Sequence, residues 1–430
     1  MIELEKELSQ AKAQRAFIAG FQEHDEDPAI IMSQLEELSD LVSNLDIIPL
    51  EPEIIRLRNY QVRYRCGSGK AEEVAQLVQE CEADILVFDS PLTPSQQRNW
   101  ERLVQCPVVG REEIILEIFA SRAQTKEAVL QVELARLEYS LPRLRRAWTH
   151  LSRQRGGGAT NRGEGEAQLE TDRRLLKRRI QQLKEELSVV RRHREAQRKS
   201  RLRRPTLQGA FVGYTNVGKS SLLNALTGAD VLVKDQLFAT LDPTARRINL
   251  PGNLEMVLTD TVGFVRNLPH QLIEAFKSTL EEAVLADILL LVLDISGENI
   301  DSEWETTLSV LKELGADEKK IVIVFNKIDR IDLRENAVKL ARLRGLFPDA
   351  HYVSAATGEG LEHLRQYLAD FAGKSRNLLH AVIPPERHDL IALAHSSGKI
   401  YEENYTPEGA AEIRFAIGEK YYHVFKEFLK

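Results

Sequence analysis

Over the N-terminal quarter of the chain, the hydrophobic positions follow two patterns: short continuous runs and a helical spacing. Apolar runs at Arg15–Phe21 and Asp84–Phe88 indicate β-strands, whereas apolar side chains at helical spacing over Ala29–Leu45 and Lys70–Ala83 indicate amphipathic helices. Because strands alternate with helices, residues 1–111 are predicted to form an N-terminal α/β domain.

One segment of this domain, Gly67-Ser-Gly-Lys70, resembles the end of a phosphate loop. A phosphate loop needs a glycine five residues before its second glycine, but Tyr64 stands there. Ala71 also replaces the magnesium-binding hydroxyl. We therefore expect no nucleotide site in this domain.

From residue 112 to residue 204 the apolar positions follow a helical repeat with alternating steps of four and three, the seam of a coiled coil. The first seam comprises Leu130, Leu134, Leu137, Leu141, Leu144, Trp148 and Leu151, and the second comprises Leu169, Leu176, Ile180, Leu183, Leu187 and Val190. Between them, residues 155–165 are too rich in glycine to be expected to form a helix. The pattern predicts an antiparallel helical hairpin over residues 112–204, kinked at Pro142 in its first arm. If that arm were continuous from Glu112 to Arg153, it would reach roughly 60 Å.

Apolar runs of the kind found in buried parallel strands follow Pro205. They are Leu207–Val212, Met256–Thr259, Ile288–Asp294, Ile321–Phe325 and Tyr352–Ser354. Helical patterns separate these runs, so residues 205–373 are predicted to form a doubly wound α/β domain. Residues 374–430 are predicted to form a small α+β domain with βαββα order and no catalytic constellation.

The charge of the chain is unevenly distributed. Its 430 residues carry a net charge of −7, yet residues 141–204 hold 20 Lys and Arg against 7 Asp and Glu. A basic segment in an otherwise acidic chain indicates a polyanionic partner. The three cysteines lie far apart, and neither a basic-then-apolar leader nor an uninterrupted apolar span is present. These features predict a cytoplasmic protein without disulfides and without stable membrane insertion.

The candidate chemistry begins at residues 213–220, Gly-Tyr-Thr-Asn-Val-Gly-Lys-Ser, which follow an apolar strand and precede a helical pattern. This is the sequence of a phosphate loop, in which backbone N–H groups surround phosphates at a helix N-terminus. Lys219 is expected to contact the β- and γ-phosphates and Ser220 to bind Mg²⁺. Asp260, at a strand end, is expected to hold Mg²⁺ through water, and Thr240 to supply a second hydroxyl. The Gly263 N–H is expected to detect the γ-phosphate.

A later strand ends in Asn326-Lys-Ile-Asp329, which predicts guanine as the base. The Asp329 carboxylate can accept hydrogen bonds from guanine N1–H and N2–H₂, a donor pair that adenine lacks. We expect Asn326 to contact the base and tie the loop together, Lys327 to cover the ring, and Ser354-Ala-Ala356 to contact guanine O6 through the backbone. GTP and GDP are therefore the predicted ligands, and Mg²⁺ is the predicted cofactor.

The complete set of predicted nucleotide-binding residues is Gly213, Tyr214, Thr215, Asn216, Val217, Gly218, Lys219, Ser220, Ser221, Phe238, Ala239, Thr240, Leu241, Asp242, Asp260, Thr261, Val262, Gly263, Asn326, Lys327, Ile328, Asp329, Ser354, Ala355 and Ala356. Lys219, Thr240 and Gly263 are predicted to act in catalysis, and Ser220, Thr240 and Asp260 in metal binding.

Two residues bear on the rate of hydrolysis. Phe264 occupies the position where many GTPases have a glutamine that orients the attacking water, so we expect slow intrinsic hydrolysis that depends on a partner. Asn216 lies where an asparagine in some GTPases helps to hold a K⁺ ion that substitutes for an arginine finger, so K⁺ is a second candidate cofactor.

Taken together, these residues resemble the HflX family of translational GTPases over almost the whole chain. The most specific segments outside the common GTPase motifs are Gln131–Ala135, Trp148–Leu151, Glu166–Arg174, Phe238–Thr244 and Asp260–Phe264. The resemblance implies an N-terminal α/β domain, a helical hairpin, a G domain and a small C-terminal domain. It also implies binding to the large (50S) ribosomal subunit, with the hairpin tip in the peptidyl-transferase region, and the splitting or rescue of stalled or stress-damaged 70S ribosomes. The family tip usually reads Arg-Gly-Pro-Gly-Glu-Thr, whereas this chain has Arg162-Gly-Glu-Gly-Glu-Ala167.

The basic hairpin independently supports an RNA partner, because glycine-tipped basic projections suit phosphate contacts in structured RNA. The predicted RNA-binding residues are Arg153, Arg155, Gly156, Gly157, Gly158, Arg162, Arg173 and Arg174. Two alternatives remain open: a GTP-controlled RNA-binding switch in large-subunit assembly or another structured-RNA process, and a solvated coiled coil. We expect a monomer and no DNA partner.

Overall fold

The computed structural model describes residues 14–147, 160–201, 207–228, 237, 238, 240, 243–251, 254–266, 282–332, 334, 336–375, 378–407, 409–417 and 419–430. These residues cluster into two compact units. The first contains the described residues up to Leu187 together with Leu237 and Phe238, and the second contains the others.

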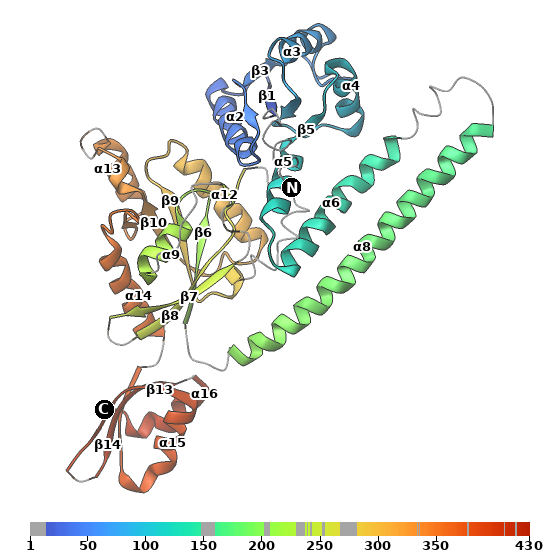
Figure 1. The fold of residues 1–430 in the computed structure, drawn as a ribbon. Helices are drawn as coiled ribbons and strands as arrows, with labels where there is room; N and C mark the ends of the chain where they lie inside the picture. Colours follow the sequence, from blue (N-terminus) through green and yellow to red (C-terminus); the bar gives the residue numbers. More distant parts are fainter. Residues whose placement is uncertain are drawn as a thin grey trace, which may run out of the picture. The chain divides into compact units, whose positions relative to one another are not determined.

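The N-terminal part of the first unit is a parallel sheet connected by helices (Figure 1). Its strands are β1 (Arg15–Gln22), β2 (Ile48–Pro49), β3 (Glu53–Arg56), β4 (Ile85–Phe88) and β5 (Val108–Gly110), in the order β2-β1-β4-β5 with β3 also paired to β1. The helices are α2 (Pro28–Ser43), α3 (Ser68–Glu80) and α4 (Pro94–Val104). Trp100 is fully buried in the core beside Phe88, with the ring centres 5.0 Å apart. The predicted N-terminal α/β fold is confirmed.

Three helices follow in the middle of the chain: α5 (Arg111–Arg122), α6 (Lys126–Ala147) and α8 (Thr160–Arg201). Helices α6 and α8 run in opposite directions (Figure 1). The predicted seam is buried at Leu130, Leu134, Ile180, Leu183 and Leu187. Two ion pairs, each 2.8 Å long, join the helices, one between Arg179 and Glu133 and one between Lys184 and Glu138.

One expectation about these helices is wrong. The helix α8 begins at Thr160 and contains Gly163 and Gly165, where we expected no helix. Each glycine costs about 1 kcal/mol relative to alanine, but propagation of an already long helix is cooperative and tolerates that cost. The condition for a first arm of full length is not met, because the chain turns between α5 and α6, where the Thr125 hydroxyl accepts a hydrogen bond from the Ala128 amide. Residues 148–159 lie outside the described residues.

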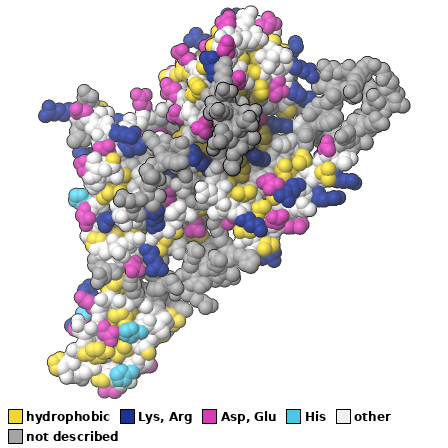
Figure 2. All heavy atoms as spheres, viewed as in Figure 1, with side chains coloured by type: hydrophobic (Ala, Val, Ile, Leu, Met, Phe, Trp, Pro, Cys, Tyr) yellow, Lys and Arg dark blue, Asp and Glu magenta, His cyan; other side chains and the backbone are white. Residues whose placement is uncertain are grey.

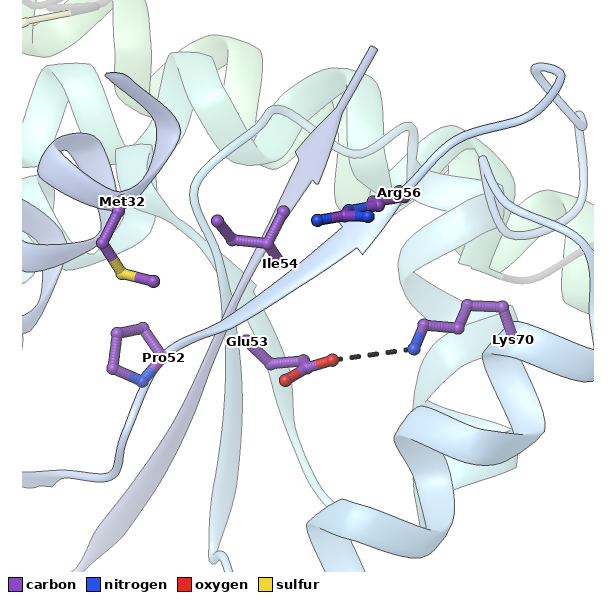
Figure 3. Close-up of a pocket in the computed structure, with 6 residues that line it drawn as sticks. All are labelled: Met32, Pro52, Glu53, Ile54, Arg56 and Lys70. Atoms are coloured by element: carbon purple, nitrogen blue, oxygen red, sulfur yellow. Dashed lines mark ion pairs between the residues drawn. The ribbon is translucent and has the colours of Figure 1, made fainter. Parts of the chain in front are cut away.

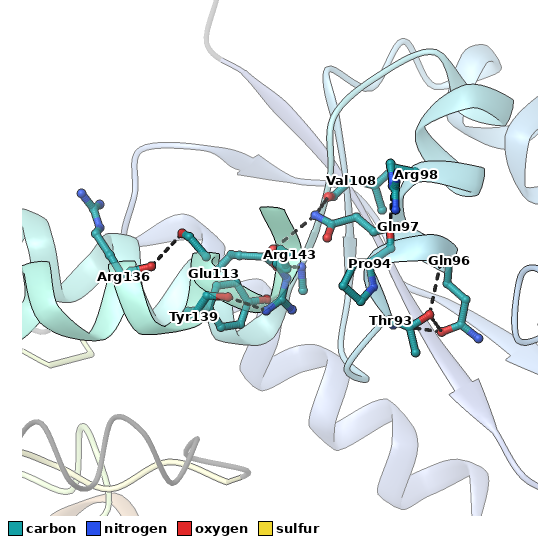
Figure 4. Close-up of polar contacts among 12 residues, drawn as sticks. Thr93, Pro94, Gln96, Gln97, Arg98, Val108, Glu113, Arg136, Tyr139 and Arg143 are labelled. Carbon is teal, nitrogen blue, oxygen red and sulfur yellow. Dashed lines mark hydrogen bonds and ion pairs between the residues drawn. The ribbon is translucent and has the colours of Figure 1, made fainter. Parts of the chain in front are cut away.

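Polar contacts join α4, α5 and the middle of α6 (Figure 4). The Gln97 amide donates to the Val108 carbonyl at 2.6 Å and to the Glu113 carboxylate at 3.2 Å. Glu113 also pairs with Arg143, whose guanidinium lies 3.3 Å from the centre of the Tyr139 ring. The C-terminal half of α6 is therefore fixed to α5 and, through Gln97, to β5 of the N-terminal sheet by side chains.

The second unit is built around a six-stranded sheet in the order β11-β10-β9-β6-β8-β7. The strands are β6 (Leu207–Gly213), β7 (Thr244–Leu250), β8 (Leu254–Asp260), β9 (Ile288–Asp294), β10 (Lys320–Asn326) and β11 (His351–Tyr352). All pairs are parallel except β7 with β8, and β7 is an edge strand that we did not predict. The helices of this domain with described bounds are α9 (Lys219–Thr227), α12 (Ile300–Glu313), α13 (Ala337–Leu346) and α14 (Leu361–Ser375). Because β6, β8, β9 and β10 are parallel, their carboxyl ends share one edge, where ligands of such sheets bind.

The C-terminal module has the predicted βαββα order, with β12 (Leu378–Ile383), α15 (His388–Ser397), β13 (Gly398–Tyr405), β14 (Ala411–Ile417) and α16 (Glu419–Phe425). The strands form an antiparallel sheet in the order β12-β14-β13. Phe415 and Phe425 are fully buried in its core. None of the helices in the described part of the chain is long and apolar enough to cross a membrane.

Candidate functional site

The phosphate loop connects the end of β6 to the start of α9. Gly218 has a φ of +90°, and a Cβ added to it would lie 2.3 Å from the Asn326 amide nitrogen. A side chain at this position would therefore be strained and would displace Asn326. The helix then begins at Lys219, so its first amides lie beside the loop, as binding of a phosphate at a helix N-terminus requires.

Lys219 is buried inside this loop. Its ammonium donates to the Tyr214 carbonyl at 2.7 Å and to the Gly213 carbonyl at 3.2 Å. Burial lowers the pKa of Lys219 to about 8, although the negative charges of Asp260 and Glu303 act in the opposite direction. The structure therefore holds a lysine of reduced basicity at the position where the phosphates are expected.

The three predicted magnesium ligands converge. The Asp260 carboxylate accepts hydrogen bonds from the Ser220 hydroxyl at 2.5 Å and from the Thr240 hydroxyl at 2.7 Å. The two hydroxyl oxygens are 2.9 Å apart. The other carboxylate oxygen of Asp260 is buried and has no hydrogen-bond partner among the described residues. Two hydroxyls and a partly unsatisfied carboxylate form the hard, all-oxygen donor set that Mg²⁺ prefers.

The segment after Asp260 contacts the phosphate loop directly. A Cβ at Gly263 would lie 2.7 Å from Thr215 Cα and 2.9 Å from Lys219 Nζ, so only glycine allows this approach. The Phe264 amide donates to the Gly213 carbonyl at 3.0 Å, and its carbonyl accepts from the Thr215 amide at 2.8 Å. The Phe264 ring is buried. The backbone of this segment thus reaches the phosphate loop while the side chain of Phe264 is packed inside the domain.

The predicted guanine-binding residues form a second cluster at the same sheet edge. Asn326 is buried, donates to the Val217 carbonyl at 2.8 Å and accepts from the Ala355 amide at 3.1 Å. It therefore ties the phosphate loop to the loop after β11. The Asp329 carboxylate is exposed and accepts one hydrogen bond, from the Ser354 hydroxyl at 2.5 Å. Its second oxygen can accept from a base.

Two contributions were missed by the sequence analysis. Asp294, at the end of β9, pairs with Lys327 at 2.7 Å and accepts from the Ser296 amide, so it orients the lysine expected to cover the base. A strand ending in aspartate at the ligand edge was the signal that could have identified it. The Tyr214 hydroxyl accepts from the Arg266 amide at 2.6 Å and links the phosphate loop to the segment after Phe264.

Other predicted residues are not brought into these clusters. The Thr261 hydroxyl donates to the Phe211 carbonyl inside the sheet. Phe238 buries its ring against Phe119, with the ring centres 4.6 Å apart. Ala239, Leu241, Asp242, Arg153, Arg155 and Gly156–Gly158 lie outside the described residues, as does the side chain of Arg162. Arg174 is exposed on α8, and Arg173 is partly exposed.

Three family models match successive parts of the chain. The model described as "GTP-binding GTPase N-terminal" matches residues 32–120, and "GTP-binding GTPase Middle Region" matches residues 122–201. The model described as "50S ribosome-binding GTPase" matches residues 208–327, which include both clusters except for the loop after β11 and Asp329.

Similar proteins match over most of their length. The chain is 45% identical to GTPase HflX of Akkermansia muciniphila, over 92% of each chain. It is 44% identical to GTPase HflX of Escherichia coli K12, over 89% of each chain. A GTP-binding protein of Sulfolobus solfataricus, solved in complex with GDP, is 26% identical with a TM-score of 0.43, covering 84% of this chain and 99% of that one.

Proposed function

This chain belongs to the HflX family of GTPases, and from that premise we propose that its GTP-bound form binds the large ribosomal subunit and splits or rescues stalled 70S ribosomes. As a member of this family it hydrolyses GTP to GDP and phosphate. In the proposed cycle, GTP favours the conformation that docks on the subunit, and hydrolysis sets the time of release.

The observation that carries the proposal is the convergence of Ser220, Thr240 and Asp260 beside Lys219. Ser220 and Thr240 would hold Mg²⁺ through their hydroxyls and Asp260 would hold it through water. When bound, the ion would neutralise charge on the phosphates. Thr240 and Gly263 lie in segments outside the phosphate loop, so contacts of these two residues with the γ-phosphate would order both segments only in the GTP form. That dependence supports a GTP-controlled switch.

Hydrolysis is expected to be slow without a partner. The Phe264 ring is buried and has no group that can orient water, so this chain supplies no equivalent of the glutamine found in many GTPases. The large subunit is the proposed partner that completes the site.

Asn216 carries a separate proposal about K⁺. Its side chain is exposed at the phosphate loop, with a φ of 59°. If Asn216 helps to hold K⁺ beside the phosphates, GTP turnover should be faster in K⁺ than in Na⁺ buffers, and Asn216→Ala should remove the difference. Equal turnover of the unaltered chain in the two salts would contradict this role.

The proposed contact with RNA lies on the basic helical arm. Arg174, Lys177 and Arg178 are exposed on α8, and no carboxylate of the described residues pairs with them. Figure 2 shows Lys and Arg side chains on this helix, interspersed with acidic and apolar ones. Exposed cations on a rigid helix suit phosphate contacts, which depend on shape and charge more than on sequence.

The test measures GTP turnover and 70S dissociation together. Purified 50S, 30S or 70S particles are added with GTP, GDP or a non-hydrolysable GTP analogue, and Lys219→Ala serves as the variant without the phosphate contact. Stimulation by 50S particles, with splitting supported by the analogue, is the expected result. Stimulation and 50S binding without any splitting would favour a GTP switch in subunit assembly. No stimulation and no nucleotide-dependent binding to particles would refute the ribosomal proposal and leave the GTPase intact.

A further inference from the structure

Residues 56–70 of the N-terminal sheet domain form a segment of opposite charge to its surroundings, which we call the basic turn. It contains five Lys and Arg and no Asp or Glu. The other residues between 14 and 111 contain 4 Lys and Arg against 17 Asp and Glu. A positive segment on an acidic domain indicates a specific anionic partner rather than a general attraction of the whole domain.

The arginines of the basic turn are available to such a partner. Arg56, Arg58 and Arg63 are exposed, and within the described part of the chain no carboxylate forms an ion pair with any of the three. Arg65 differs, because it pairs with Glu23 at 3.5 Å and lies over the Phe21 ring. The Arg63 guanidinium also lies over an aromatic ring, 5.0 Å from the centre of Tyr64. Exposed guanidinium groups without a carboxylate partner suit bidentate contacts with phosphate.

Two apolar side chains stand out in water beside these arginines. Tyr60 is 62% exposed and Val62 is 79% exposed. The Tyr60 hydroxyl accepts a hydrogen bond from the Gln96 amide at 3.1 Å. Gln96 is itself buried and fixed by the capping box with Thr93 at the start of α4 (Figure 4). The tyrosine ring is therefore held at its hydroxyl end and open to solvent over most of its surface, which suits stacking of a nucleic-acid base.

The backbone of the basic turn is fixed as well. Gln61 and Arg65 exchange two backbone hydrogen bonds, of 3.2 and 2.8 Å. Two side chains of α4 also bind the turn. Asn99 donates to the Arg63 carbonyl at 2.9 Å, and Trp100 donates to the Tyr64 carbonyl at 3.1 Å. A turn that is already ordered loses little conformational entropy when a partner binds.

A hollow of about 420 Å³ adjoins the basic turn and is lined by Met32, Pro52, Glu53, Ile54, Arg56 and Lys70. Arg56 and Lys70 reach toward the same space (Figure 3). Glu53 pairs with Lys70 at 3.6 Å and reduces the positive charge of the hollow. The exposed arginines and Tyr60, rather than the hollow, are therefore the stronger recognition elements.

We propose that the basic turn is a second RNA-binding surface, which takes a single-stranded or looped segment with its phosphates on Arg58 and Arg63 and one base on Tyr60. That the RNA is ribosomal rests on the proposed function. An acidic protein surface is the competing partner, since tyrosine and arginine are both common at protein interfaces. We favour RNA because one flexible strand can place a base on the open Tyr60 ring and its phosphates on the neighbouring arginines, and the experiment separates the two partners.

The experiment compares the full-length chain with four variants: Arg58→Ala/Arg63→Ala, Tyr60→Ala, Tyr60→Phe and Arg102→Ala. Arg102 is an exposed arginine on α4 of the same domain and serves as the matched control. Binding to a labelled single-stranded RNA and to 50S particles is measured over a range of KCl concentrations. Ultraviolet cross-linking followed by trypsin should place a nucleotide on the peptide Asn59–Arg63 of the unaltered chain.

The double variant should weaken RNA binding about tenfold and lower the slope of log K against log salt by about 1.4, as expected for two lost phosphate contacts with a single strand. Tyr60→Ala should weaken binding by about 5- to 100-fold and Tyr60→Phe much less, because the ring remains. Intrinsic GTP hydrolysis should stay unchanged in all four variants, because Lys219, Asp260 and Asn326 of the nucleotide site lie in the other unit. An unchanged far-ultraviolet circular dichroism spectrum and thermal unfolding curve show that the altered N-terminal domain is folded.

Three outcomes would overturn the proposal. If the unaltered chain binds RNA but the double variant and Tyr60→Ala behave like Arg102→Ala, the basic turn is not the contact. If these variants lose binding to 50S particles but not to protein-free RNA, the partner is a protein. Cross-links found only on other peptides would also show that the basic turn is not the RNA contact. Failure of the unaltered chain to bind 50S particles at all would refute the ribosomal proposal, while the RNA measurements would still test the basic turn.

Discussion

Asp329 is the residue on which selectivity for guanine is expected to depend. One of its carboxylate oxygens is occupied by the Ser354 hydroxyl, which fixes the side chain in position. Hydrogen bonds to a charged group contribute roughly 1.5–3 kcal/mol, so loss of the carboxylate should be visible in affinity.

Asp329→Asn should therefore weaken GTP binding by about 10- to 100-fold and improve binding of xanthosine triphosphate, whose C2 carbonyl can accept from the new amide. Competition binding with the two nucleotides measures this change. Asp317→Asn, an exposed aspartate in the loop before β10, is the matched control. Unchanged GTP selectivity in Asp329→Asn would move the base site elsewhere.

The lowered pKa of Lys219 predicts that nucleotide affinity depends on pH. Burial lowers its pKa to about 8, so in the free protein the amine loses its proton as the pH rises through that value. Bound phosphate favours the charged form, so GDP affinity should fall above about pH 8, and close to one proton should be taken up per GDP at about pH 9 and far less at about pH 7. Calorimetry in buffers with different heats of ionisation counts these protons. Guanosine, which has no phosphate, is the control, and an equal uptake with guanosine would contradict the assignment to Lys219.

Individual residues of the site were predictable to the extent that a local motif determines them. Asp260 and Asn326 each end an apolar run, and the carboxyl ends of parallel strands share one edge of a sheet, so the two residues could be assigned to that edge from the pattern of the chain. The contact of the Tyr214 hydroxyl with the Arg266 amide was not predictable, because 52 residues separate the two groups and only tertiary packing brings them together.

At the level of elements, the apolar repeat correctly predicted the helices α6 and α8. The glycine-rich composition led us to expect a later start for α8 than the structure has. A propensity argument treats each glycine separately, whereas helix formation is cooperative, so Gly163 and Gly165 do not end a helix of 42 residues. The strand β7 was missed because it is an edge strand with exposed residues, including Thr244 and Ala245, and so lacks a continuous apolar run.

The buried seam makes a prediction about the pairing of α6 and α8. Leu183 is completely buried, so Leu183→Ala should lower the free energy of opening these helices by about 2–5 kcal/mol through lost burial and a new cavity. Hydrogen exchange across α6 and α8 measures the change. Leu175→Ala, at a position of the same helix that is 53% exposed, should have little effect. Equal exchange in the two variants would mean that the seam does not hold the hairpin.

At the scale of the whole molecule, the chain clusters into two compact units, with the N-terminal sheet and most of the middle helices in one of them. The proposed division into domains at residues 1–111, 112–204, 205–373 and 374–430 stays a prediction. A change in the spacing of apolar residues marks where one kind of secondary structure gives way to another. Side-chain contacts such as that of Glu113 with Arg143 decide which elements share a unit, and the spacing of apolar residues does not reveal such contacts.

We propose that the hairpin tip contacts the ribosome whereas the nucleotide site hydrolyses GTP, and a deletion of the tip tests this separation. Removal of residues 156–165 should spare intrinsic GTP hydrolysis, because Lys219, Asp260 and Asn326 of the nucleotide site lie in the second unit, and should abolish stimulation by 50S particles. Replacement of the same ten residues by Gly and Ser keeps the length of the chain and separates an effect of length from an effect of sequence. Stimulation that survives the deletion would show that this tip is not the activating contact.

The two hydrogen bonds of Asn326 also constrain how such a protein can evolve. Because one amide group holds both the Val217 carbonyl and the Ala355 amide, any replacement that alters the base loop at this position also loosens the phosphate loop. A lineage that changed its nucleotide preference through Asn326 would lose affinity for every nucleotide before it gained a new one. Asp329 makes no contact of this kind with the phosphate loop, so a single substitution at Asp329 can change the preferred base. Asn326 should therefore stay unchanged while the base preference changes.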